Sequence, residues 1–237
     1  MNSSQIVGDA HIEADIVVIG GGGAGLASAA TAAEKGARVA LLEKQAIGGN
    51  SAIAAGILAA ESQLQKSLNI VTTKEEVVRI AMEYSHWSID RRIYSAFVAK
   101  SADTIDWLEA KGIDFDIGPC YPGQYPITYH KADGGGAAII RAMRKSCEDL
   151  GVKLFTHCPA KKILTGEAGE VVGVVASMSD QELSIATTSV IIATGGYGGN
   201  RDLLKKYFPS FGENMILEGL PLMGDGLFLA LDVGAAT

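Results

Sequence analysis

The stretch from Asp15 to Lys44 constrains the fold of this chain more than any other. It begins with a short apolar run over 16–19 that is rich in β-branched residues, which favours a central strand. Four glycines follow, and a segment of small residues over 24–35 is predicted to form a helix that ends at a glycine. A second strand is expected over 38–42. This order of strand, glycine turn, helix and strand predicts an α/β fold with a parallel sheet.

The glycines of this turn fit the pattern G-x-G-x-x-G at Gly20, Gly22 and Gly25. The first permits a tight turn, the second lets a pyrophosphate approach the backbone, and the third lets the helix pack close to the strands. The helix start offers unpaired N–H groups and a partial positive charge to phosphates. Glu43 ends the second strand, at about the spacing expected for a carboxylate that binds ribose hydroxyls. We predict a dinucleotide site rather than a purely structural turn, and the motif alone does not distinguish FAD from NAD.

Composition and charge argue against several other classes of protein. The 237 residues are 48% hydrophobic and 20% charged, which is typical of a globular chain with a buried core. The net charge is −7 and no basic block occurs, so nucleic acid is not an expected partner. No apolar run approaches the roughly 20 residues that span a bilayer.

The N-terminus and the cysteines bear on the cellular compartment. Residues 1–15 lack the basic-then-apolar order of a signal peptide, so a cytoplasmic location is the default expectation. Cys120, Cys147 and Cys158 show no C-x-x-C spacing, which favours reduced thiols over a disulfide framework or a zinc site. No metal site is expected.

One domain over 14–237 is expected after a loose lead-in over 1–13. The remaining helices are expected over 74–84, 89–111, 134–150, 201–207 and 225–233. The helix over 89–111, with a possible break near Ser101, should bury Ile93, Phe97, Ile105 and Leu108. The expected strands are 152–158, an antiparallel meander formed by 162–177 and 182–188, and a second buried strand over 190–193. Irregular loops are expected over 61–71 and 113–132.

Several features allow both a functional and a structural interpretation. The strand over 190–193 runs into a glycine turn, which suggests another edge of the same ligand site because α/β sheets bind ligands at the carboxyl ends of their strands. The small residues that follow Gly49 could lie against a flat ligand or form a close helix contact. The glycines over 134–136 could face an anion or permit close packing. His130 could lie near an active site, although a lone loop histidine is more often a packing or surface residue.

Four stretches, in this order, resemble the fumarate reductase and succinate dehydrogenase flavoprotein family, which includes soluble fumarate reductases, 3-ketosteroid dehydrogenases and L-aspartate oxidase. They are IGGGGAGLASA with LLEK, then GGNSAIAAG, then VIIATGGYGGN, then MGDGLFLALDVGAA. The stretch SADTIDWLEAKGIDF is also similar to a family helix. The resemblance covers the chain from about residue 15 onward and favours FAD over NAD. It implies a Rossmann-like FAD-binding domain with a parallel central sheet and a small antiparallel meander.

The resemblance also implies which residues contact the cofactor. Gly20, Gly22, Gly23, Ala24 and Gly25 would hold the pyrophosphate, Glu43 the adenosine ribose, and Lys44 would lie beside the adenosine. The pyrophosphate and flavin would be lined by Gly49, Asn50, Ser51, Ala54, Ala55 and Gly56. The backbone of Ala160 would touch the adenine. Ala193, Thr194, Gly195 and Gly196 would pass beneath the nucleotide, and Asp225 would lie on the phosphate–ribityl side.

Two departures from the family pattern matter. Covalent members carry a flavin-linked histidine after the second strand, and residues 44–60 contain no histidine, so non-covalent FAD is implied. Ala55 stands where many relatives have glycine, and its methyl group would crowd the flavin slightly.

The reaction implied by the resemblance is hydride transfer between flavin and an activated C–C bond of an unsaturated carboxylate or an enone, with a separate electron-donor protein as a further possible partner. The alternatives are an L-aspartate-oxidase-like amine oxidation and a non-catalytic FAD-binding module. In relatives, the substrate-capping domain and its histidine and arginine residues follow the Gly-Asp-Gly helix. We therefore expect these 237 residues to lack that domain and the catalytic acid, and no catalytic residue is assigned.

Overall fold

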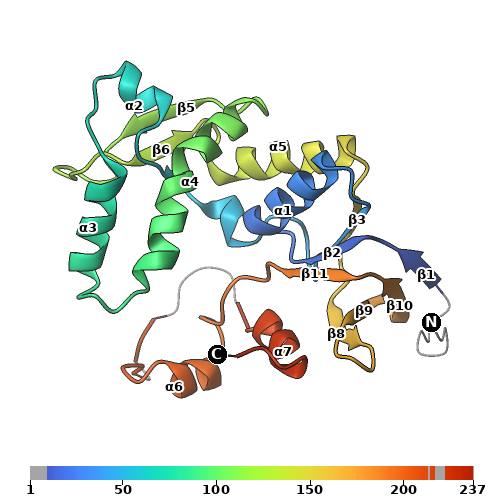
Figure 1. The fold of residues 1–237 in the computed structure, drawn as a ribbon. Coiled ribbons are helices and arrows are strands. Elements are labelled where there is room, and N and C mark those ends of the chain that lie inside the picture. Colours follow the sequence, from blue (N-terminus) through green and yellow to red (C-terminus); the bar gives the residue numbers. More distant parts are fainter. Residues whose placement is uncertain (1–9, 213, 217–221, 237) are drawn as a thin grey trace. The chain divides into compact units, whose positions relative to one another are not determined.

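The structure is a computed structural model that describes residues 10–212, 214–216 and 222–236 (Figure 1). The chain divides into two compact units. The first unit comprises Met1–Ser51 and Met143–Thr237, and the second comprises Ala52–Ala142. In the described part of the chain, no helix combines the length and the apolar character needed to cross a membrane.

A four-stranded parallel sheet in the order β11-β2-β3-β7 forms the centre of the first unit. Its strands are β11 (Ser189–Ile192), β2 (Ile16–Ile19), β3 (Val39–Leu42) and β7 (Lys153–Phe155). Helix α1 (Gly23–Glu34) connects β2 to β3 and buries Gly25, Leu26, Ala29 and Ala30, which confirms the predicted strand–helix–strand unit. All four residues of β3 are buried, whereas Ile192 of β11 is 38% exposed, so the prediction of a second buried strand was wrong in that respect.

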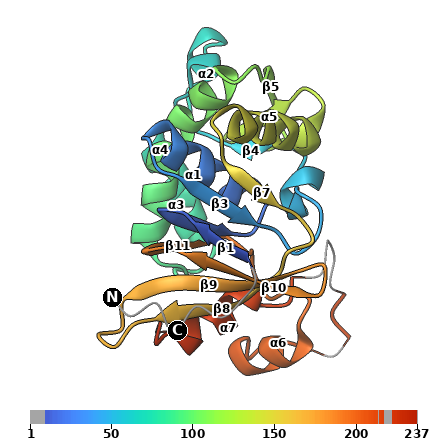
Figure 2. The ribbon, with the colours of Figure 1, turned by 90° about the vertical axis from the view of Figure 1, so that its right-hand side faces the viewer.

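A second sheet in the order β1-β10-β9-β8 packs beneath the parallel sheet (Figure 2). Its strands are β1 (Ala10–Glu13), β10 (Gln181–Ala186), β9 (Val171–Met178) and β8 (Ala160–Thr165). Strands β8, β9 and β10 are the predicted antiparallel meander. Strand β1 pairs in parallel with β10, so the predicted loose lead-in is corrected at residues 10–13, and residues 1–9 lie outside the described residues.

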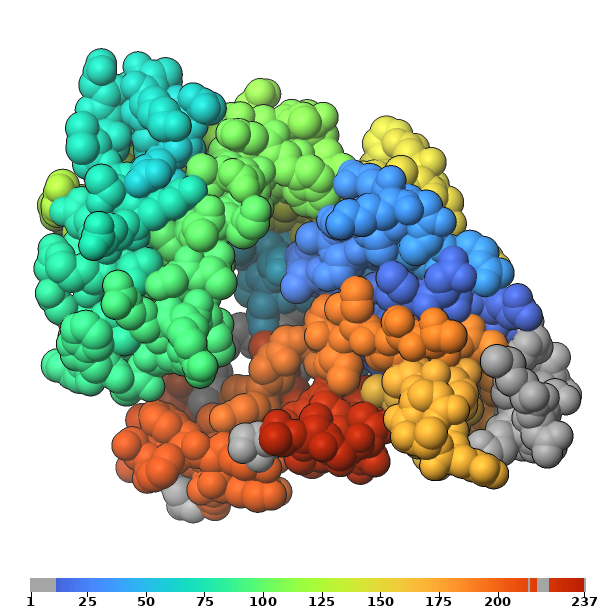
Figure 3. Space-filling view, in the orientation of Figure 1, coloured from blue at the N-terminus to red at the C-terminus, as the bar shows by residue number. Residues whose placement is uncertain are grey.

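Two short helices belong to the later part of the first unit. Helix α6 (Arg201–Tyr207) is capped by the Asn200 side chain, which accepts hydrogen bonds from two amides of its first turn. Helix α7 (Asp225–Asp232) begins after Gly224 and lies beside β8, as Figure 3 shows for the red and yellow segments. Both helices confirm the predicted ranges to within one residue.

The second unit combines three helices with a small antiparallel sheet. The helices are α2 (Gln63–Ser67), α3 (Lys74–Tyr84) and α4 (Arg91–Glu109), and the strands, in sheet order, are β4 (Ile57–Leu58), β6 (Tyr129–Ala132) and β5 (Phe115–Gly118). A short 3₁₀ helix, η2 (Gly49–Ile53), precedes the unit, and α5 (Gly135–Asp149) runs from it into the first unit. The predicted loops over 61–71 and 113–132 therefore contain regular elements.

Helix α4 differs from its prediction in two ways. It is continuous through Ser101, which is buried and bonds to a carbonyl of the preceding turn. Ile105 and Leu108 are buried as predicted, but Ile93 and Phe97 are 72% and 50% exposed. The buried stripe instead continues through Val98 and Ala102, because the helix presents a neighbouring face to α3.

Candidate nucleotide-binding site

The glycine turn lies where the carboxyl end of β2 meets the end of β11. The amide of Ala193 donates to the carbonyl of Ile19 over 2.7 Å. Gly20 has a φ of +111°, and a Cβ atom there would lie 2.4 Å from the carbonyl oxygen of Ala193. A Cβ atom on Gly25 would lie 1.8 Å from the carbonyl oxygen of Gly20. Both positions therefore require glycine, the first for the turn and the second for the close approach of α1.

The first turn of α1 lies beside Gly48 and Ser51. Gly22 precedes the helix and no side chain caps it, while the amide of Gly23 donates to Oγ of Ser51 over 3.1 Å. A Cβ atom built on Gly22 would have its nearest neighbours 3.8 Å away, at the carbonyl of Gly48 and at Ser51. Gly22 carries no side chain that would block an anion from the first N–H groups of the helix, which have no intrahelical acceptor, although that of Gly23 already donates to Ser51. These residues fit the phosphate groups of a dinucleotide.

The carboxylate of Glu43 is held by two backbone amides. Oε2 accepts from the amide of Gly21 over 2.6 Å, and Oε1 accepts from the amide of Gln45 over 2.8 Å. Each carboxylate oxygen has a second lone pair, so both can still accept from a hydroxyl. The side chain is therefore fixed in orientation at the end of β3, as a ribose-binding carboxylate requires.

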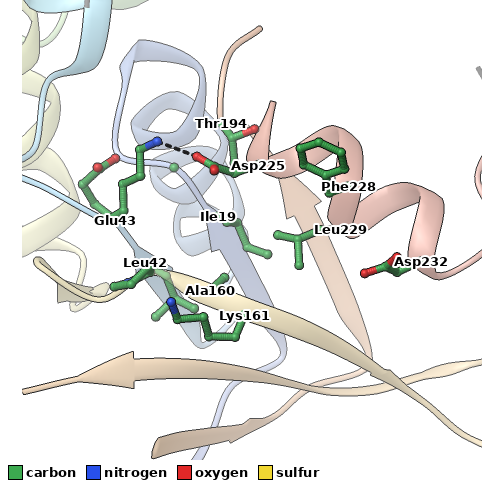
Figure 4. Close-up of a pocket in the computed structure, with 13 residues that line it drawn as sticks. Ile19, Leu42, Glu43, Ala160, Lys161, Thr194, Asp225, Phe228, Leu229 and Asp232 are labelled. Atoms are coloured by element: carbon green, nitrogen blue, oxygen red, sulfur yellow. Dashed lines mark hydrogen bonds and ion pairs between the residues drawn. The ribbon is translucent and has the colours of Figure 1, made fainter. Parts of the chain in front are cut away.

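A cavity of about 290 Å³ lies at this edge of the parallel sheet. Small-molecule sites occupy roughly 300–1,000 Å³, so this cavity suits one part of a dinucleotide rather than the whole. Ile19 of β2 and Leu229 of α7 point toward one another in its middle (Figure 4). The apolar middle suits a flat ring, and the charged rim suits the polar groups attached to such a ring.

An ion pair closes one end of the cavity. Nζ of Lys44, two positions after β3, lies 2.5 Å from Oδ2 of Asp225, the first residue of α7, and the dashed line at Asp225 in Figure 4 marks this contact. The amide of Gly226 donates to Oγ1 of Thr194 over 3.1 Å, and a Cβ atom at Gly226 would lie 2.2 Å from that oxygen. The start of α7 is thereby fixed to the ends of both β3 and β11.

The structure gathers most of the predicted cofactor residues in the first unit. Those lining the cavity are Gly20, Glu43, Lys44, Ala160, Thr194 and Asp225. Those in the glycine turn, the start of α1 and η2 are Gly22, Gly23, Ala24, Gly25, Gly49, Asn50 and Ser51. Those that follow β11 are Ala193, Gly195 and Gly196. The three that belong to the second unit, before β4, are Ala54, Ala55 and Gly56. Their roles at a cofactor stay predictions.

Sequence reasoning missed several residues of the cavity lining. They are Ile19, Leu42, Pro159, Lys161, Phe228, Leu229 and Asp232. A signal for three of them was present, because Phe228, Leu229 and Asp232 follow Asp225 by three, four and seven positions. Residues at that spacing share one face of a helix.

His130 lies in β6 of the second unit and is fully buried. Its Nδ1 lies 3.0 Å from the carbonyl oxygen of Thr128, and its Nε2 lies 2.7 Å from Oγ of Ser62. Burial lowers the pKa of the imidazole, and the contact with Thr128 opposes that shift. Since Nδ1–H donates to the carbonyl, Nε2 accepts the Ser62 hydroxyl proton, and a neutral ring satisfies both contacts. Packing thus accounts for this side chain.

The family model described as an FAD binding domain matches residues 15–237. The chain belongs to this FAD-binding domain family. The match covers the glycine turn, Glu43 and the whole cavity lining, which supports the assignment of the dinucleotide as FAD.

This FAD-binding domain is similar to parts of longer proteins that are named as reductases. It is 35% identical over 230 residues to the vinyl phenol reductase of Lactiplantibacillus plantarum, with 95% of this chain and 46% of the relative covered. It is 31% identical to a fumarate reductase (cytochrome) of Shewanella frigidimarina, and the match covers 95% of this chain and 41% of the relative. The structure of the open conformation of a flavocytochrome c3 fumarate reductase matches with a TM-score of 0.85 at 29% identity, covering 95% of this chain and 41% of that one. The chain thus spans less than half the length of these relatives.

Proposed function

We propose that this FAD-binding domain serves a flavin oxidoreductase that reduces an activated C=C bond. The observation that carries the proposal is the joining of the glycine turn, Glu43 and the α7 cavity at one sheet edge, in a chain that is similar over 95% of its length to alkene reductases. The substrate class would be a small molecule whose double bond is conjugated to a carboxylate, a carbonyl or an aromatic ring.

The chain's own residues would bind and orient the cofactor. The backbone at Gly22 and the first turn of α1 would receive the pyrophosphate, and Glu43 would accept bonds from the adenosine ribose. The apolar cavity between Ile19 and Leu229 would hold the adenine end. When bound, FAD would supply hydride transfer at its flavin ring. Non-covalent attachment and a cytoplasmic location stay predictions from the sequence.

The test is a flavin half-reaction under anaerobic conditions. The protein, expressed with any residues that its gene encodes beyond these 237, is loaded with FAD, reduced with a viologen, and mixed with 4-vinylphenol, fumarate, urocanate or acrylate while flavin absorbance is followed. We expect at least one alkene to reoxidise the flavin faster than the matched saturated compound does. Reduction of the oxidised flavin by L-aspartate, with no response to any alkene, would replace the proposal by an amine oxidation. FAD binding without a response to either class would favour a binding module.

A further inference from the structure

We propose that Lys44 is a positioning residue that neutralises Asp225, so that the α7 carboxylate does not repel the pyrophosphate of FAD. This inference deepens the function proposed above and rests on FAD binding at this cavity. It concerns the contact between the two side chains, which joins the end of β3 to the start of α7 across 181 positions of sequence.

The charges around the cavity give the first argument. Among the described residues that line it, three carboxylates, Glu43, Asp225 and Asp232, face two ammonium groups, Lys44 and Lys161. A pyrophosphate adds further negative charge to a lining that already has an acidic excess. Charges around so small a cavity act on a bound anion over about one Debye length, which is about 8 Å at physiological salt.

The position of Asp225 gives the second argument. The residue opens α7, where a carboxylate is favoured by the helix dipole, and the Gly226–Thr194 hydrogen bond holds this turn in place. The backbone of Asp225 is therefore held at the cavity. The ammonium group of Lys44 is 2.5 Å from its Oδ2, which leaves Oδ1 available to accept a bond from the cofactor.

Lys161 provides a matched control within the same cavity. It also lines the cavity, but it lies in β8 instead of following β3. The ion pair with Asp225 is made by Lys44 and not by Lys161. Removing the charge of Lys161 changes the charge of the lining by the same amount as removing that of Lys44. The Lys44 change should depend more strongly on Asp225, because Lys44 contacts that carboxylate directly.

The experiment is a double-mutant cycle on the affinity of the apoprotein for FAD, measured by quenching of flavin fluorescence. We expect Lys44→Gln to weaken binding about two- to fivefold, because it leaves a carboxylate facing the pyrophosphate in a partly exposed site. Asp225→Asn in the Lys44→Gln background should recover most of that loss, and Lys44→Arg should bind almost as the parent does. Asp225→Asn should rescue Lys161→Gln much less than it rescues Lys44→Gln, because the direct contact with Asp225 is made by Lys44. The Lys44→Gln deficit should also shrink as salt is raised.

The outcomes separate this inference from the proposed function. If the parent apoprotein binds no FAD, the proposed function itself fails. If the parent binds FAD but the Lys44→Gln, Asp225→Asn double variant binds no better than Lys44→Gln alone, the neutralising role is overturned. Thermal melting of each apoprotein variant separates a loss of affinity from a loss of folded protein.

Discussion

Oε2 of Glu43 lies 2.6 Å from the amide nitrogen of Gly21, so the end of β3 is hydrogen-bonded directly to the glycine turn that follows β2. The other carboxylate oxygen accepts from the amide of Gln45. One side chain thus orders two loops at the carboxyl edge of the sheet before any ligand contact is considered. This arrangement gives Glu43 a structural role beside its predicted role at the ribose.

Removing the Glu43 carboxylate should therefore weaken FAD binding strongly. Glu43→Ala loses both amide contacts and the ribose acceptor, and charge-assisted bonds are worth about 1.5–3 kcal/mol each, so we expect a loss of about tenfold or more. Titration of the apoprotein with FAD measures this loss of affinity. Glu170→Ala is a suitable control, because that carboxylate also accepts from a backbone amide, that of Ala168, but does so in the turn between β8 and β9. Unchanged affinity in Glu43→Ala would exclude the ribose role.

Because α1 lies so close to the glycine turn, we expect alanine at Gly25 to lower the stability of the protein. In Gly25→Ala the new methyl group would lie 1.8 Å from the Gly20 carbonyl, so the helix or the turn must shift. We expect a loss of stability of about 1–3 kcal/mol or more, seen as a lower melting temperature, together with weaker FAD binding. Gly198→Ala adds the same methyl group where no atom lies within 4 Å, and should be nearly neutral. Equal melting temperatures for the two variants would contradict this account.

The local parts of this fold could be predicted from the sequence, because their signals are local. The strand over 16–19, the glycine turn and α1 follow from short runs of residue types, and Asn200 marks the start of α6 by its capping chemistry. By contrast, the pairing of Lys44 with Asp225 depends on how distant elements pack. No spacing in the chain encodes that contact.

The errors have equally physical causes. Phe97 follows the apolar spacing of α4, yet it is half-exposed because α3 packs on the neighbouring face. The segment over 113–132 contains prolines and aromatics, so its residue types do not predict strands. It nevertheless forms the two short strands β5 and β6, which are stabilised by their antiparallel pairing. Strand β1 was missed because it lies at the edge of its sheet in the described chain and pairs with β10, which comes about 170 positions later.

The sequence also predicts how FAD is attached. Residues 44–60 contain no histidine, which is the residue that bonds to the flavin in covalent members of the resembling family. We expect acid precipitation of the yellow protein to release all flavin into the supernatant, where its fluorescence identifies FAD. Yellow colour that stays in the washed pellet would show a covalent bond and direct attention to another attachment residue.

The buried His130 predicts a pH dependence of stability for the second unit. Its pKa is lowered from the ordinary 6.5, chiefly by burial, so below about pH 6.5 the unfolded chain takes up a proton that the folded chain resists. Stability should therefore be full above that pH and should fall as the pH drops through the lowered pKa.

The hydrogen bonds explain why the proton is resisted. A protonated ring must donate from Nε2 to Oγ of Ser62, which already accepts from the amide of Gln65 at the start of α2, and the Ser62 proton would then lose its acceptor. Urea unfolding between pH 7.5 and 5 measures the effect, and His130→Gln is the comparison, because an amide does not titrate in that range. We expect the variant to be less stable at pH 7.5 but to lose less stability on acidification than the parent. Parallel pH profiles for the two proteins would show that His130 does not carry the dependence.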